Sequence, residues 1–309
     1  MSDLPPTVPD SPAADHVTVF EEARPRLVGL AYRITGSLVD AEDVVSEVWL
    51  RWAEADHEAL ARPQAWLATV TVRRAIDWAR ARVRRRETYL GPWLPEPVVT
   101  DWPADADPEV AAELADSLSL GFLTVLDRLD PVARAVFLLA DIWGWSFAEV
   151  AAAVGRSATA CRQLASRARR RAYGHPRRYQ APGGPLTGRW WTGLVAVLAA
   201  GDIETTLDLL APDVVLVSDG WSTTHAARHP VVTAERVANF LLNLARRLPP
   251  AGVAVDSVIV NGTPGIVVHA PSNPEVVMAC EVQDGRVVRI WTVLAPEKLR
   301  RVGDPPTMR

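Results

Sequence analysis

The chain is poor in the residues that would indicate redox, metal or membrane functions. It has only two cysteines, Cys161 and Cys280, and neither has a second thiol or a histidine nearby at metal-ligand spacing. No stretch approaches the roughly 18 apolar residues needed to span a bilayer, and the polar N-terminus lacks the apolar segment of a signal peptide. We therefore expect a cytoplasmic protein with no disulfide, metal ion, cofactor or membrane anchor.

Lysine is also nearly absent, since Lys298 is the only lysine among 33 basic residues. The formal net charge of −4 argues against a uniformly basic nucleic-acid-binding protein. The charges are nevertheless unevenly placed, with arginines concentrated in residues 80–86 and 162–178 and acids in residues 101–116. This local clustering is compatible with binding to nucleic acid through two separate basic surfaces.

Residues 147–171 have the layout of a helix-turn-helix, in which a short apolar helix and a strongly basic helix are joined by a glycine turn. Gly155 permits the sharp turn, and Ser157 can cap the second helix by accepting a hydrogen bond from a backbone N–H. Such a second helix can present its first residues to base edges in the major groove and its arginines to phosphates. The alternative is a helical hairpin with a solvated basic face.

The length of 309 residues is sufficient for two or three domains. Helical periodicity and proline-rich breaks predict two all-α domains followed by an α+β domain, with strands at about 213–217, 253–260, 265–269, 276–282 and 287–294. Asp284-Gly285 predicts a hairpin between the last two strands. The expected segments are a helical domain at 16–90, a proline-rich acidic linker at 91–117, a helix-turn-helix domain at 118–174, a linker at 175–186 and the α+β domain at 187–303.

Three stretches carry a family resemblance. Residues 31–52, AYRITGSLVDAEDVVSEVWLRW, are similar to the polymerase-binding part of sigma region 2. Residues 62–97, RPQAWLATVTVRRAIDWARARVRRRETYLGPWLPEP, resemble its promoter-opening helix and a following WLPEP linker motif, and residues 126–171 are similar to sigma region 4. The chain thus resembles the bacterial extracytoplasmic-function sigma factors, in particular the group with a SnoaL-like C-terminal domain, an NTF2-like cone.

The resemblance implies a non-enzymatic factor that brings core RNA polymerase, through its β′ and β subunits, to promoters with −10 and −35 elements. The C-terminal cone would regulate this activity in cis, and it could bind a small-molecule or protein ligand. Two alternatives remain: a polymerase-independent DNA-binding regulator with a ligand-sensing cone, and a SnoaL-like enzyme fused to a DNA-binding module. The enzyme would need a general acid or base, for which Asp219, His225 and His229 are the candidates, although they lie in turn or loop sequence.

The resemblance also implies roles for individual residues. The acidic face expected to bind core polymerase comprises Asp40, Glu42, Asp43 and Glu47. The −10 DNA-binding set comprises Arg73, Arg74, Asp77, Arg80, Arg84 and Arg85, where positive charge can compensate the DNA backbone. Trp66 and Trp78 are interpreted as core residues. The −35 DNA-binding set comprises Ser157, Thr159, Arg162 and Gln163 as base readers, with Arg167 and Arg170 on phosphates.

Regulation is expected to involve the linker and the cone. The group has a DGGGK-like motif where this chain has residues 219–223, and an NPDKL-like motif where it has residues 295–299. Prolines stiffen the WLPEP segment, so it should dock on a folded surface at low entropic cost. The predicted regulatory contacts are Trp93, Leu94, Pro95, Asp219, Gly220 and Lys298.

Overall fold

The computed structural model describes residues 12–86, 91–101, 119–173, 188–220, 226–247, 253–270 and 273–302. The chain forms two compact units: residues 1–81, 131–164 and 307–309 make the first, and residues 82–130 and 165–306 make the second. Helices α3 (Pro63–Arg86) and α8 (Ala158–Tyr173) each begin in the first unit and end in the second. These units are distinct from the domains defined by sequence, whose boundaries stay a prediction.

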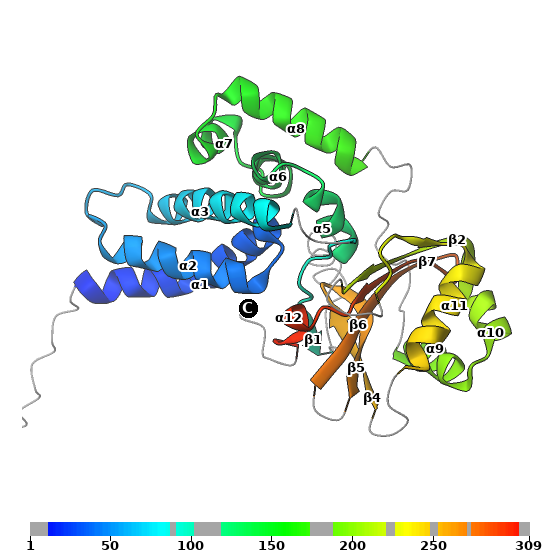
Figure 1. Ribbon diagram of the computed structural model, residues 1–309. Coiled ribbons are helices and arrows are strands. Elements are labelled where there is room, and N and C mark those ends of the chain that lie inside the picture. Colours follow the sequence, from blue (N-terminus) through cyan, green and yellow to red (C-terminus); the bar gives the residue numbers. More distant parts are fainter. Residues whose placement is uncertain are drawn as a thin grey trace, which may run out of the picture. The chain divides into compact units, whose positions relative to one another are not determined.

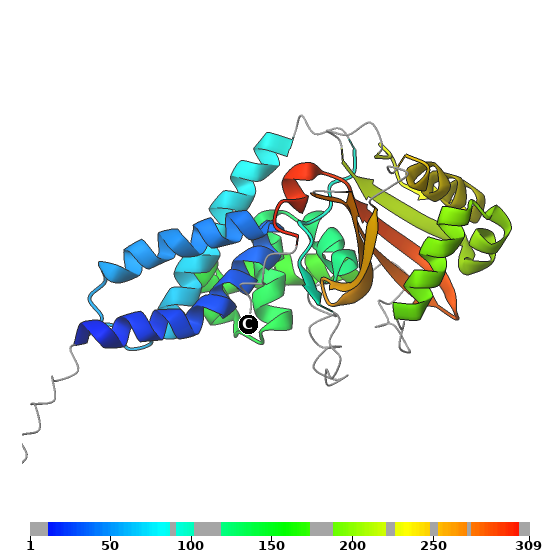
Figure 2. The ribbon, with the colours of Figure 1, turned by 90° about the horizontal axis from the view of Figure 1, so that it is seen from below.

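The first unit begins with three helices. α1 (Pro12–Thr35) and α2 (Leu38–Ala53) run side by side, as Figure 2 shows, and α3 follows. Gly36, in the left-handed conformation with φ 71°, allows the tight connection between α1 and α2, and the Ser37 hydroxyl caps α2 by accepting from the Asp40 backbone N–H. Buried side chains recur at helical spacing on α2: Leu38, Ala41, Val44, Val45, Val48 and Trp52. This apolar stripe holds α2 against its neighbours.

The same unit contains α6 (Pro131–Phe137), a π-helical turn (Leu138–Ile142), α7 (Phe147–Val154) and the first part of α8. The predicted helix-turn-helix is confirmed locally. Gly155 takes the left-handed conformation, with φ 66°, and the Ser157 hydroxyl accepts from the Ala160 N–H at 3.1 Å. A capping box between Ser146 and Glu149 begins α7, which fixes where the first helix of the motif starts.

The second unit is built on a seven-stranded sheet of order β1-β4-β5-β6-β7-β2-β3. The strands are β1 (Val99–Asp101), β2 (Leu210–Asp219), β3 (Val231–Val232), β4 (Ala254–Val260), β5 (Thr263–Ala270), β6 (Asn273–Gln283) and β7 (Arg286–Val293). Only the β2–β7 pair is parallel among these strands. The predicted hairpin between β6 and β7 is confirmed, with Asp284 and Gly285 at φ 51° and 75°.

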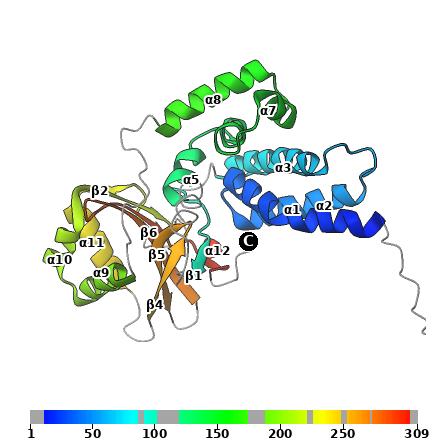
Figure 3. The same ribbon diagram turned by 180° about the vertical axis from the view of Figure 1, so that it is seen from behind.

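Both faces of this sheet are covered. Helices α9 (Gly188–Ala200), α10 (Ile203–Leu209) and α11 (Ala234–Ala245) lie over one face, as the opposite views of Figures 1 and 3 show. The other face packs against Leu94, against Leu120 of α5 (Leu120–Asp127) and against Leu299 of α12 (Pro296–Leu299). Consecutive residues Ile266 and Val267 serve the two different cores, as the period of two along a strand requires.

The linker segment supplies one of the two edge strands of the sheet, β1. β1 pairs antiparallel with β4, Val99 lying opposite Val260, and Leu94 just before it is completely buried. The sequence predicted docking of residues 93–95 but did not predict a strand here. No helix among the described residues is both long enough and apolar enough to cross a membrane.

Candidate nucleic-acid interface and linker clamp

The predicted acidic face lies on α2, where it is flanked by exposed apolar side chains. Asp43 is exposed, whereas Asp40, Glu42 and Glu47 are half-buried. Partial desolvation, and then the nearby carboxylates, raise the pKa of Asp43. The clustered charge therefore carries an electrostatic cost in the folded chain, which a positively charged partner would relieve.

Two apolar residues extend this surface beyond what the sequence predicted. Leu50 is 64 % exposed and Val39 is 44 % exposed. Leu38 takes the core position on α2, and Val39 is exposed because the next residue in a helix points about 100° away. These two exposed apolar side chains add contact area for a protein partner to the surface that carries the carboxylates.

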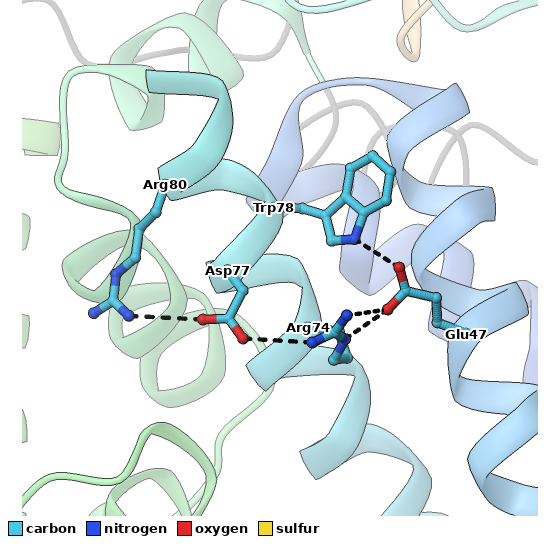
Figure 4. A network of polar contacts seen from close by, with 5 residues as sticks. All are labelled: Glu47, Arg74, Asp77, Trp78 and Arg80. Atoms are coloured by element: carbon cyan, nitrogen blue, oxygen red, sulfur yellow. Dashed lines mark hydrogen bonds and ion pairs between the residues drawn. The ribbon is translucent and has the colours of Figure 1, made fainter. Parts of the chain in front are cut away.

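Glu47 belongs to an internal network and not simply to the acidic face. Figure 4 shows its carboxylate receiving hydrogen bonds from both Arg74 and Trp78 of α3. The Arg74 Nε–Glu47 Oε2 distance is 2.7 Å, and the Trp78 Nε1–Glu47 Oε1 distance is 3.2 Å. Asp77 lies 3.8 Å from both Arg74 and Arg80. The structure thus joins residues that the sequence assigned to two different partners, and it fixes α2 to α3.

The remaining residues of the −10 set differ in their surroundings. Arg80 is exposed, with 44 % of its side chain accessible. Arg73 is engaged by backbone carbonyls of α7, at 2.7 and 3.0 Å. The side chains of Arg84 and Arg85 lie outside the described residues. Trp78 is half-buried, like Trp66, whose ring packs 5.6 Å from that of Trp52.

Helix α8 and Ser157 just before it present all the predicted −35 residues to solvent. The inner face of the helix holds Cys161, Ala165 and Ala168, which are buried at helical spacing. The opposite side exposes Ser157, Thr159, Arg162, Gln163, Arg167 and Arg170. The Arg162 guanidinium lies 5.6 Å from the centre of the Phe147 ring, which links the start of α8 to α7. A basic helix exposed along one side has the form that enters a major groove.

The predicted regulatory contacts meet at one buried site in the second unit, which we call the linker clamp (Trp93, Leu94, Asp219, Asn261 and Lys298). Asp219, at the end of β2, accepts a hydrogen bond from the Leu94 N–H at 2.6 Å and forms an ion pair with Lys298 of α12. Lys298 also donates to the Leu94 carbonyl at 2.5 Å. Both ionised side chains therefore hold the main chain of the linker, and Pro95 and Gly220 are buried beside them.

Cations flank the tryptophan of the clamp. The Lys298 Nζ lies 3.2 Å from the centre of the Trp93 ring, and the Arg82 guanidinium lies 4.7 Å from it. Arg82 is only 7 % exposed. Cation–π attraction is strongest when the cation is desolvated, so Trp93 fixes the end of α3 to the cone.

Asn261 is the clamp residue that sequence reasoning missed. It is 1 % exposed, its Oδ1 accepts from the Val98 N–H at 3.0 Å, and its own N–H donates to the Val98 carbonyl at 2.8 Å. Asn261 has φ 51°, which asparagine tolerates better than most residues. The Asn261-Gly262 turn between two apolar runs was the available signal, but it indicated a hairpin and not a binding role.

Of the three candidates for a general acid or base, the structure describes Asp219 and His229. Asp219 is buried in the ion pair with Lys298, His229 is exposed in a loop, and His225 lies outside the described residues. The described residues contain no cluster of three or more potential metal-ligating side chains.

A helix-turn-helix, a basic helix fixed to an acidic-apolar one, and a cone that holds the connecting linker define a sigma-type transcription factor with a fused C-terminal domain. The family models for Sigma-70 region 2 and Sigma-70 region 4 match residues 19–85 and 119–171. The chain is 38 % identical over 291 residues to the ECF RNA polymerase sigma factor SigJ of Mycobacterium tuberculosis, covering 91 % of this chain and 92 % of that one. It belongs to the extracytoplasmic-function family of RNA polymerase sigma factors.

Two further similarities extend over nearly the whole chain. The probable ECF RNA polymerase sigma factor SigI of M. tuberculosis is 31 % identical over 284 residues, covering 89 % of this chain and 92 % of the relative. The crystal structure of M. tuberculosis SigJ superposes with a TM-score of 0.72 at 37 % identity, covering 94 % of this chain and 99 % of that one. The predicted fold class, with two helical parts and a SnoaL-like cone, is confirmed. Factors of this family bind core RNA polymerase and promoter DNA through regions 2 and 4.

Proposed function

We propose that this sigma factor binds core polymerase through the α2 surface formed by Asp40, Glu42, Asp43, Val39 and Leu50. The exposed apolar side chains beside a repelling carboxylate cluster support this assignment. Glu47 takes a different part: by holding Arg74 and Trp78 it positions the promoter-opening helix against the polymerase-binding helix. Polymerase binding and promoter opening would thus be coupled through one carboxylate.

A charge reversal tests the polymerase surface. Asp43→Lys should weaken co-purification of the full chain with core polymerase, because it places a cation where we expect an acidic contact. Glu58→Lys is the matched control, since Glu58 is also exposed but lies in the loop after α2. Equal binding by both variants and the unaltered chain would remove Asp43 from the proposed surface.

Promoter reading is assigned to α3 and α8. Arg80, Arg84 and Arg85 would contact the −10 region, and the first turns of α8 would read the −35 element. The single observation that carries the −35 assignment is the continuous exposed side of α8, opposite the buried face of Cys161 and Ala165. Ser157, Thr159, Arg162 and Gln163 are the base readers in this proposal.

The test separates base readers from phosphate contacts in transcription by reconstituted holoenzyme. Arg162→Ala should lose about 1–3 kcal/mol of discrimination between altered −35 sequences, whereas Arg170→Ala should weaken all promoters similarly and lower the salt slope by about one. Arg246→Ala, an exposed arginine at the end of α11, is the control. Identical profiles for Arg162→Ala and Arg170→Ala across the −35 panel would refute the assignment.

The cone is proposed to regulate the factor in cis, without a catalytic role, in the cytoplasm where the polymerase works. The linker clamp supports this role, because its buried charged and amide groups bind the main chain of residues 94–98. A molecule that binds one state of the linker more tightly would shift the equilibrium between clamped and released linker by the difference in its affinity for the two states. Transcription would change with that equilibrium. Transcription by chains with and without clamp substitutions measures this regulation, and equal output would make the cone a passenger.

A further inference from the structure

Two arginines in the first unit donate hydrogen bonds to backbone carbonyls at the C-terminal ends of helices: one runs from α3 to α7 and the other from α6 to α1. Arg73 of α3 donates to the Ala152 and Ala153 carbonyls in the last turn of α7, at 2.7 and 3.0 Å. Arg134 of α6 donates to the Ile34 carbonyl in the last turn of α1, at 2.6 Å. Arg73 of α3 therefore caps the C-terminal end of α7, and Arg134 of α6 caps the C-terminal end of α1.

These are favourable places for a guanidinium group. The last carbonyls of a helix have no intrahelical donor, and they form the negative end of the helix dipole. In α7 the turn at Gly155 uses only the Ala151 carbonyl, which accepts from the Gly155 and Arg156 N–H groups. The carbonyls of Ala152 and Ala153 are the next ones along, and Arg73 takes both.

Weaker contacts lie beside the two caps. Arg62, just before α3, forms an exposed ion pair with Glu149 of α7 at 3.4 Å. Arg33, near the end of α1, lies 5.5 Å from the centre of the Trp143 ring. The caps and these contacts together join α1 and α3 to α6 and α7.

This joined state is incompatible with simultaneous reading of two promoter elements. The −10 and −35 positions are about 25 base pairs apart, or roughly 85 Å at 3.4 Å per base pair. An α8 helix of 16 residues spans only about 24 Å. A region 2 helix held in hydrogen-bonding contact with α7 therefore cannot contact the −10 element while α8 contacts the −35 element.

We propose that Arg73 and Arg134 form a pair of reciprocal helix caps that holds regions 2 and 4 together in the free chain, and that Arg73 exchanges the carbonyls of α7 for promoter DNA when the caps open. The proposal rests on the proposed function for the identity of the DNA elements. It makes Arg73 a residue with two successive partners, so the same side chain stabilises the closed state and the promoter complex.

A reversible lock tests the incompatibility. The double variant Arg62→Cys/Glu149→Cys places two thiols at the exposed ion pair, for joining by a bis-maleimide that contains a reducible disulfide, and the native cysteines are buried. The locked chain should lose promoter-specific transcription with core polymerase at least about tenfold and regain it on reduction. Undiminished transcription by the locked chain would overturn the proposal. Each single-cysteine variant, treated in the same way, is the control.

The caps themselves are tested by substitution in the same double-cysteine chain. Arg73→Ala and Arg134→Met should each slow crosslinking of the free chain, by roughly tenfold for the loss of charge-assisted hydrogen bonds. Only Arg73→Ala should also lower the salt slope of promoter binding by holoenzyme, by about one. An unchanged slope would refute the exchange, and unchanged crosslinking by both variants would refute the caps.

Failure of the proposed function is distinguishable from failure of the caps. If the reduced double-cysteine chain does not transcribe with core polymerase at all, the sigma assignment of these helices fails. The crosslinking rates of the free chain do not involve polymerase or DNA, so they still test the reciprocal caps in that case.

Discussion

Replacing Lys298 of the linker clamp should release the linker and lower the unfolding free energy of the second unit by several kcal/mol. The Lys298 and Asp219 side chains are 5 % and 0 % exposed, and both contact Leu94. In Lys298→Met the Asp219 carboxylate stays buried without its cationic partner, and the Leu94 carbonyl loses its donor. Breaking a buried ion pair in this way costs about 3–5 kcal/mol, so we expect a loss of that size in the unfolding free energy of the second unit.

Hydrogen exchange of the Leu94 and Val98 amides measures this prediction directly, because their acceptors are Asp219 and Asn261. A cost of 3 kcal/mol corresponds to exchange faster by more than about 100-fold. Arg300→Met, at an exposed position directly after α12, is the control and should leave the exchange unchanged.

The double variant Lys298→Met/Asp219→Leu separates charge from packing. The second substitution removes the carboxylate that Lys298→Met leaves without a cation. The double variant should therefore be no less stable than Lys298→Met alone, although Leu94 then lacks both of its side-chain hydrogen-bond partners. If Lys298→Met changes the Leu94 exchange rate by less than about fivefold, the buried ion pair does not hold the linker.

Three further predictions concern other parts of the chain. Asp43→Asn should stabilise the first unit by roughly 0.5 kcal/mol in urea denaturation, since it removes like-charge pairs at helical spacing, while weakening polymerase binding; destabilisation would contradict this. Gly265→Ala should destabilise the second unit by about 1–3 kcal/mol because its Cβ would lie 2.5 Å from the Met278 carbonyl oxygen, whereas Gly193→Ala, with open space around it, should not. Burial raises the pKa of the Cys280 thiol, so it should stay protonated and unreactive toward thiol reagents up to pH 9 until the unit unfolds; rapid labelling of the native chain would show otherwise.

Local patterns were sufficient to predict the helices and the turn chemistry. Gly155 and Ser157 act where the helix-turn-helix pattern placed them, and Asp284-Gly285 makes the expected hairpin. Their roles depend on neighbours within a few residues, so the sequence contains the whole signal. The strand at residues 213–217 was also predicted, although β2 extends from Leu210 to Asp219.

The contacts between distant segments were less predictable. The pairing of Glu47 with Arg74 and Trp78 depends on how α2 and α3 cross, which helical spacing does not specify. Strand β1 has only three residues, too few for a visible alternation, and its partner lies far along the chain. The family motifs gave Leu94, Asp219 and Lys298, but not the geometry in which both charged groups bind one residue of the linker.

The edge strand β1 also has a consequence for synthesis of the protein. Val98 and the Asn261 that receives its N–H are separated by 163 residues. At about 5–20 residues per second, a ribosome needs roughly 10 to 30 s to make that stretch. The helix-turn-helix, which ends with α8 at Tyr173, is completed within this interval, while β1 still waits for its partner β4. The chain therefore passes through a period in which its helix-turn-helix is complete while the sheet of the second unit is still being made.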